Sequence, residues 1–110
     1  MKLASVKTWM VKLTDNHGSF EAVDKLSDAQ GLWFPCPKCY AANHGMRGTH
    51  YVLCWFVGVS QDIAPKPGRW IATGTDLTDI SFVGPNAASV LLTSGCKWHG
   101  YIRNGETVDA

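Results

Sequence analysis

Two short segments of the chain carry metal-binding side chains at the same spacing. The first segment holds Cys36 and Cys39, and the second, near the C-terminus, holds Cys96 and His99. Two intervening residues let one tight turn, here called a knuckle, direct both side chains at a single ion. Three thiolates and one imidazole form a complete tetrahedral zinc shell. The sequence therefore predicts one structural zinc ion bound by these four residues, because a closed shell leaves no position for a substrate.

The two knuckles are far apart in the chain. About 56 residues separate Cys39 from Cys96, far more than in a compact zinc ribbon. The intervening strands must therefore bring the knuckles together. Binding of a structural zinc ion contributes roughly 10–16 kcal/mol in small zinc peptides. This is more than the net stability of most domains, so we expect loss of the metal to be close to loss of the fold.

Other residues could compete for these roles. A single Cys-x2-Cys pair can also be a redox pair or two buried cysteines, but Pro37 and the second knuckle favour a metal. Cys54 lies among apolar residues and is predicted to be a small core side chain, with a role as substitute ligand if His99 is displaced. His44 and His50 flank a glycine-rich turn, where either could face the zinc, but we expect solvated loop histidines.

Known catalytic motifs do not fit the chain. The stretch 35–39 matches the second half of the zinc-deaminase signature, but no His-x-Glu precedes it: His17 and Glu21 have the wrong spacing. A ββα-metal nuclease would need Asn86 and His99 in catalytic roles, and His99 is better used as a ligand. Phosphate-binding loops and nucleophile elbows are missing. We therefore predict no catalytic residues, with a small metal-dependent hydrolase or nuclease as the alternative.

Composition limits the class of protein. The chain has 110 residues, 45% of them hydrophobic, and a net charge of +1. These values predict one folded domain over residues 1–110 and give no electrostatic reason to expect an anionic partner. The sequence shows neither a membrane span nor a signal-peptide core. We expect a soluble cytoplasmic protein, in which four cysteines favour metal binding over disulfides.

The glycines and prolines divide the chain into short pieces rich in β-branched and aromatic residues. We predict strands at 8–13, 51–57, 69–73, 80–83 and 89–92, a helix from a cap at Ser19 through Ala29, a surface loop at 61–68 and a turn at 84–86. Asn104-Gly105 predicts a hairpin over 101–108. The expected fold class is mainly β: a small single-domain antiparallel sheet with one short helix, closed by a zinc site built from two distant knuckles.

Five tryptophans and a few cations are candidates for contact with a partner. Trp33 and Trp55 lie in apolar runs and are predicted to be core, whereas Trp70 is the best exposed candidate. Trp98 could shield the zinc sulfurs or point outward. Lys38, Lys97 and Arg103 would gather near the metal if the knuckles meet, where offsetting thiolate charge is a more ordinary role than phosphate binding.

The chain resembles a family of small zinc-binding proteins of phages and prophages, some of which carry the label "ammonia monooxygenase". The matching stretches are 31–39, 48–50, 67–70, 88–90 and 95–106, and the last, Gly-Cys-Lys-Trp-His-Gly-Tyr-Ile-Arg-Asn-Gly-Glu, is the most specific. The resemblance implies a zinc-binding β domain with Cys36, Cys39, Cys96 and His99 as ligands, and it does not imply oxygenase chemistry. We expect an accessory protein that binds a protein or nucleic-acid partner in the host cytoplasm, with a virion or assembly component as an alternative.

Overall fold

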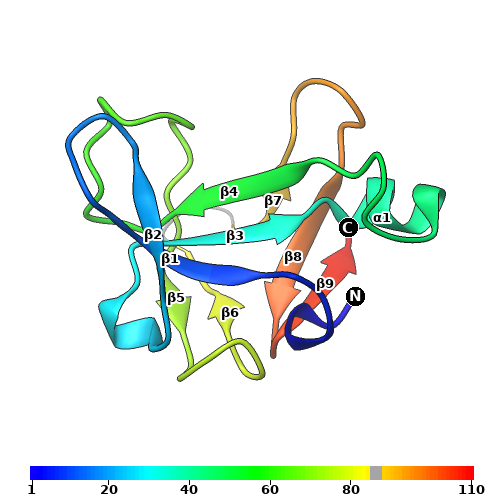
Figure 1. Cartoon of the computed structure of the whole chain (residues 1–110), viewed down its shortest axis with the longest axis horizontal. Coiled ribbons are helices and arrows are strands. Elements are labelled where there is room, and N and C mark those ends of the chain that lie inside the picture. Colours follow the sequence, from blue (N-terminus) through cyan, green and yellow to red (C-terminus); the bar gives the residue numbers. More distant parts are fainter. Residues whose placement is uncertain (85–87) are drawn as a thin grey trace.

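In a computed structural model, residues 1–84 and 88–110 are described, and the turn predicted at 84–86 lies largely outside these ranges. The elements in chain order are η1 (Leu3–Ser5), β1 (Trp9–Leu13), β2 (Phe20–Val23), η2 (Leu26–Asp28), β3 (Gly31–Pro35), α1 (Pro37–Asn43), β4 (Tyr51–Trp55), β5 (Ala72–Thr73), β6 (Ser81–Phe82), β7 (Val90–Leu91), β8 (His99–Arg103) and β9 (Glu106–Asp109). The chain is mainly antiparallel β with one short α-helix, as the sequence predicts (Figure 1). Among the described residues, no helix is long and apolar enough to cross a membrane.

The largest sheet has the strand order β2-β1-β3-β4, and it buries side chains on both faces. Alternate residues of a strand point to opposite faces. One face contributes to the main core, which also receives side chains from β6 to β8; its fully buried members are Leu3, Leu32, Phe34, Cys36, Cys54, Ile80 and Ile102. The other face carries Val11 and Trp55, which pack against Val59 and Ile63. The sheet is therefore covered on one side by the smaller sheets and on the other by a loop.

That loop, residues 57–68, is organised by one arginine. The Arg69 guanidinium donates hydrogen bonds of 2.6–3.0 Å to five carbonyl oxygens, those of Val59, Ser60, Ile63, Pro65 and Gly68. The Trp55 indole N–H donates to the Ala64 carbonyl at 2.9 Å. The loop that covers this face of the sheet contains no strand, and it is stabilised because its backbone carbonyls accept hydrogen bonds from a charged donor.

The C-terminal hairpin is confirmed. Asn104 and Gly105 have φ values of 48° and 76°, as a type I′ turn requires, and they join β8 to β9. Gly105 also lies very close to the backbone of Thr78: a Cβ atom at this position would be 2.5 Å from the Thr78 carbonyl oxygen. The Thr107 N–H donates to the Met1 carbonyl at 2.9 Å, so the two termini lie side by side (Figure 1).

The helix predicted from Ser19 through Ala29 is wrong. Residues 20–23 form β2, which pairs with β1 in the register Leu13↔Phe20 to Met10↔Val23, and residues 26–28 form one 3-10 turn. Val23 and Leu26 have helical spacing, but pairing with β1 satisfies the same backbone groups and lets Phe20 pack edge-on against Trp33 at 5.3 Å.

The α-helix lies instead directly after the first knuckle cysteine. Cys36 is its N-cap residue and Pro37 its first residue, and His44, with a φ of 54°, ends it. Pro37 is its one buried residue, so α1 shows none of the apolar periodicity by which helices are recognised. Strands β5, β6 and β7 have two residues each and are shorter than predicted.

Candidate metal centre

Three separate segments bring metal-binding atoms together. Cys36 joins β3 to α1 and Cys39 lies in the first turn of α1. His50 immediately precedes β4, and Cys96 lies in the turn between β7 and β8. We call these four residues the metal cluster. Their ligand atoms all lie within 4.8 Å of one another. With zinc–sulfur bonds of about 2.3 Å, a tetrahedral ion holds sulfurs about 3.8 Å apart, so the cluster has the size of one zinc shell.

Strand pairing explains why His50 reaches the cluster. β3 and β4 pair from Gly31↔Trp55 to Pro35↔Tyr51, and the Cys36 N–H extends this ladder by donating to the His50 carbonyl at 2.8 Å. Cys36 and His50 are therefore cross-strand neighbours, and residues opposite each other have side chains on the same face. His50 lies beside Cys36 because of the register of the sheet, and its Nε2 is 3.4 Å from the Cys96 Sγ.

The first knuckle is preorganised by its own backbone. The Tyr40 N–H donates to the Cys36 carbonyl at 2.8 Å, and the N–H groups of Cys39 and Lys38 act against burial to lower the pKa of the Cys36 thiol. Cys36 is fully buried, and its Sγ lies 3.3 Å from that of Cys96. The thiol thus sits in a setting that favours the thiolate once a cation is present.

The second knuckle is a tight turn with two left-handed residues. Gly95 has a φ of 63° and Lys97 a φ of 55°, and the Lys97 N–H donates to the Ser94 carbonyl at 3.3 Å. The Lys38 ammonium donates to the Cys96 carbonyl at 2.9 Å and so links the two knuckles directly. This cation also offsets the negative charge that three thiolates bring to the site.

His99, the fourth ligand expected from the sequence, lies outside the metal cluster. It is exposed on β8, opposite Leu91, with its ring 6.3 Å from that of Tyr101. Trp98 points into the core, so the alternation of β8 directs His99 to the other face. The structure brings three of the four expected ligands together, Cys36, Cys39 and Cys96, and places His50 with them.

The other candidate ligands have clear positions. Cys54 is fully buried in the main core, which confirms the prediction of a small core side chain, and it does not stand in for His99. His44 ends α1 and is exposed outside the cluster. His50 is exposed, as expected, but it also belongs to the metal cluster, a role that the sequence named as possible and did not assign. Its signal was the antiparallel pairing of the two strands, which sets residue 50 opposite residue 36.

The two closest thiols differ in acidity. Burial raises the pKa of the Cys36 thiol to about 12. At Cys96 burial also acts to raise the pKa, but the hydrogen bonds with His50 and Cys36 outweigh it and lower the value to about 6. The lower pKa of Cys96 makes it the more readily ionised of these two thiols, and metal binding to either releases its proton.

Aromatic residues around the cluster are mostly structural. Trp98 is buried, donates from its indole to the Asp109 carboxylate at 2.9 Å and packs edge-on against Phe34. Trp98 therefore points inward rather than outward, and it belongs to the core against which Cys39 and Cys96 pack. Of the three expected cations Lys38 contacts a knuckle, whereas Arg103 stacks on the Tyr101 ring at 4.2 Å.

The donor set indicates which ion the cluster could hold. Thiolates and imidazole suit zinc, whereas magnesium, calcium and manganese prefer oxygen ligands. Four protein donors complete a tetrahedral shell, which is typical of structural zinc sites. Comparison of the chain with protein-family models, curated proteins and solved structures found no match. Function is therefore inferred from the metal cluster and the surfaces beside it.

Proposed function

We propose that the protein is a zinc-stabilised binding domain without catalytic activity of its own. The observation that carries this proposal is the convergence of three thiols and one imidazole from three separate segments. One structural zinc ion would bind the metal cluster. In keeping with the resemblance to phage and prophage zinc proteins, the domain would act as an accessory protein in the host cytoplasm by binding a protein or nucleic-acid partner.

The positions of the ligands support a role in closing the fold. Cys36, Cys39 and His50 belong to one end of the four-stranded sheet, and Cys96 belongs to the three-stranded sheet β7-β8-β9. Among the described residues, strand pairing joins no strand of one sheet to a strand of the other. A zinc ion would add a strong link between these sheets, in addition to the core packing.

The coordination argues against an enzyme. A catalytic zinc ion keeps one position for water or substrate, and a zinc ion bound by all four donors of the metal cluster would keep none. His50, which a metal-dependent hydrolase would need as a free base, is one of the four. The alternative reading, a small hydrolase or nuclease, therefore lacks both an open metal position and that histidine.

Metal content and folding test the proposal together. Native mass spectrometry at neutral pH should show one zinc ion per chain, and removal of zinc with EDTA should abolish the cooperative thermal transition seen by circular dichroism. Cys36→Ser should lose the ion. Cys54→Ala is the matched control, because Cys54 is equally buried but lies outside the cluster, and it should keep zinc.

Two results would contradict the proposal. A metal-free protein that unfolds cooperatively at the same temperature would remove the structural role of zinc. Reproducible turnover of DNA, RNA or generic esters that follows the zinc content would establish an enzyme instead of a binding domain.

A further inference from the structure

One edge of the four-stranded sheet is open. β4 is the last strand in the order β2-β1-β3-β4. The Cys36 N–H donates to the His50 carbonyl and the Phe56 N–H donates to the Gln30 carbonyl, so even-numbered residues of β4 bond to β3. In an antiparallel pair, alternate residues direct both backbone groups away from the partner. The N–H and C=O groups of Tyr51 and Leu53 therefore point outward, and no described residue pairs with them.

A second open edge lies across a groove. β7 is the first strand of the order β7-β8-β9, and the Leu92 N–H donates to the Trp98 carbonyl at 2.9 Å. Residues 90 and 92 thus bond to β8, and the backbone groups of Leu91 point away from it. A groove of about 710 Å³ is lined by residues 50–54 on one side and 89–94 on the other. Two strand edges therefore border the same space, and their outward backbone groups pair with none of the residues 1–84 and 88–110.

Both ends of the groove are fixed. At one end the metal cluster joins His50, just before β4, to Cys96, just after β7. At the other end the Trp70 N–H donates to the Trp55 carbonyl at 3.1 Å, and its indole N–H donates to the Ser89 carbonyl at 3.1 Å. β4 therefore runs from the metal end to the Trp70 end and β7 runs back. An inserted strand would be parallel to one edge and antiparallel to the other.

Trp70 already pairs through its backbone with the residues at the end of β4, so this edge can hydrogen-bond to an added strand. Trp70 forms a parallel bridge with Phe56, and the Val57 N–H donates to its carbonyl at 2.9 Å. Pro67 and Pro65 precede it and have no N–H to donate, so this segment cannot continue the ladder along β4.

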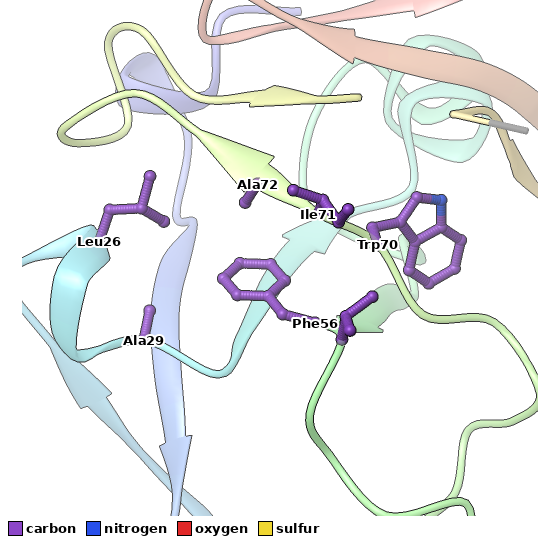
Figure 2. A pocket seen from close by; sticks show the side chains of 7 residues that line it. Leu26, Ala29, Phe56, Trp70, Ile71 and Ala72 are labelled. Carbon is purple, nitrogen blue, oxygen red and sulfur yellow. The ribbon is translucent and has the colours of Figure 1, made fainter. Parts of the chain in front are cut away.

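The Trp70 indole points away from the hollow formed by Leu26, Ala29 and Phe56 (Figure 2). That hollow, of about 260 Å³, has a wholly apolar side-chain lining, so it offers no polar side chain to orient a ligand.

We propose that an extended peptide segment of a partner protein inserts as a strand between β4 and β7. The chemistry is main-chain hydrogen bonding to Tyr51 and Leu53 on one side and to Leu91 on the other, a recognised mode of peptide binding. The groove walls include Val52, Val90 and Leu92, and among the described residues that line it Lys66 is the one lysine, arginine or carboxylate residue. The segment would therefore carry apolar side chains at alternate positions and little positive charge.

This inference rests on the proposed function, because it names the class of partner for a zinc-stabilised binding domain. The metal cluster fixes one end of the groove, so removal of zinc should release a bound peptide. Failure of the two claims can be told apart. A chain without zinc refutes the proposed function, whereas a folded, zinc-loaded chain that binds no extended peptide refutes the inference alone.

The test begins with a random dodecapeptide library displayed on phage and selected against the zinc-loaded full chain. Selected peptides are synthesised and their affinities measured by calorimetry. NMR of the complex should show shifts and slowed hydrogen exchange at the amides of Tyr51, Leu53 and Leu91. N-methylation of a central peptide amide should weaken binding at least tenfold, because it removes a main-chain donor.

Proline substitutions test the two edges separately. Leu53→Pro and Leu91→Pro each remove an outward N–H and should weaken peptide binding at least tenfold, whereas Leu53→Ala and Leu91→Ala keep the N–H and should bind nearly as wild type. Leu91 is 58% exposed, so its proline variant remains informative if Leu53→Pro does not fold. Zinc content and circular dichroism establish the fold of each variant.

Four results would overturn the inference. The selection could yield no binding peptide. The selected peptides could bind the proline variants as tightly as the alanine variants, or they could change the NMR shifts of amides outside the two edges. A stable dimer of the chain whose protected amides are those of Tyr51 and Leu53 would also overturn it, because a second copy would then occupy the edge.

Discussion

His50 immediately precedes β4 and His99 is the first residue of β8, but the two strands direct these histidines differently. His50 is the cross-strand neighbour of Cys36, and its Nε2 lies 3.4 Å from the Cys96 Sγ. His99 is exposed and faces away from the core side of β8. We therefore predict that His50→Ala weakens zinc binding and that His99→Ala does not. Loss of a group that merely orients a ligand costs roughly 10–100-fold in metal affinity, so loss of a ligand should cost at least about 100-fold.

Competition with a chromophoric zinc chelator measures both affinities on the same scale. The two variants are matched in chemistry, because each replaces one histidine near the knuckles by alanine. A zinc affinity that falls in His99→Ala and stays at the wild-type value in His50→Ala would show that the Cys-x2-His knuckle binds the ion after all. Equal losses in both would show that the cluster rearranges when the metal binds.

The connection between β5 and β6 depends on one carboxylate. Asp79 accepts hydrogen bonds from the Asp76 N–H at 2.9 Å and from the N–H and hydroxyl of Thr75 at 2.8 and 3.0 Å. These bonds, led by the Asp76 N–H, lower the pKa of Asp79 below its usual value. A lowered pKa in the folded state stabilises the protein above the ordinary aspartate pKa of about 3.9, and this stabilisation is lost as the pH falls through the folded-state value.

Asp79→Asn should therefore lower the Tm at neutral pH, and the difference from wild type should shrink as the pH falls below about 4. Differential scanning calorimetry between pH 3 and 7 measures both effects, and any loss of zinc in acid affects the two proteins alike. Asp62→Asn is the control, because the Asp62 carboxylate accepts none of the hydrogen bonds among the described residues. A Tm difference between Asp79→Asn and wild type that stays constant over this range would contradict the role of the charge.

On the scale of the whole molecule, local patterns in the sequence predicted part of the fold. The apolar run at 51–57 and the Asn-Gly pair predicted β4 and the β8-β9 hairpin, since each signal is contained in a few neighbouring residues. β2 was predicted as helix because Val23 and Leu26 have helical spacing, and its strand form depends on pairing with β1. α1 escaped prediction because it buries one residue, Pro37.

The metal cluster was predictable to a similar degree. Cys36, Cys39 and Cys96 follow from the spacing of two short motifs. His50 follows from a register between β3 and β4, which motif spacing does not contain. His99 has the right spacing in sequence, but the alternation of β8 directs it outward because Trp98 takes the inward position. Residues brought together by sheet pairing therefore need the topology before they can be assigned.

The central claim is that one zinc ion holds the two sheets together through three sulfurs and one nitrogen. X-ray absorption at the zinc edge of the purified protein tests it most directly. We predict about three sulfur neighbours at about 2.3 Å and one nitrogen neighbour at about 2.0 Å. A shell with two or fewer sulfurs, or one containing a water oxygen in place of the imidazole, would contradict the account.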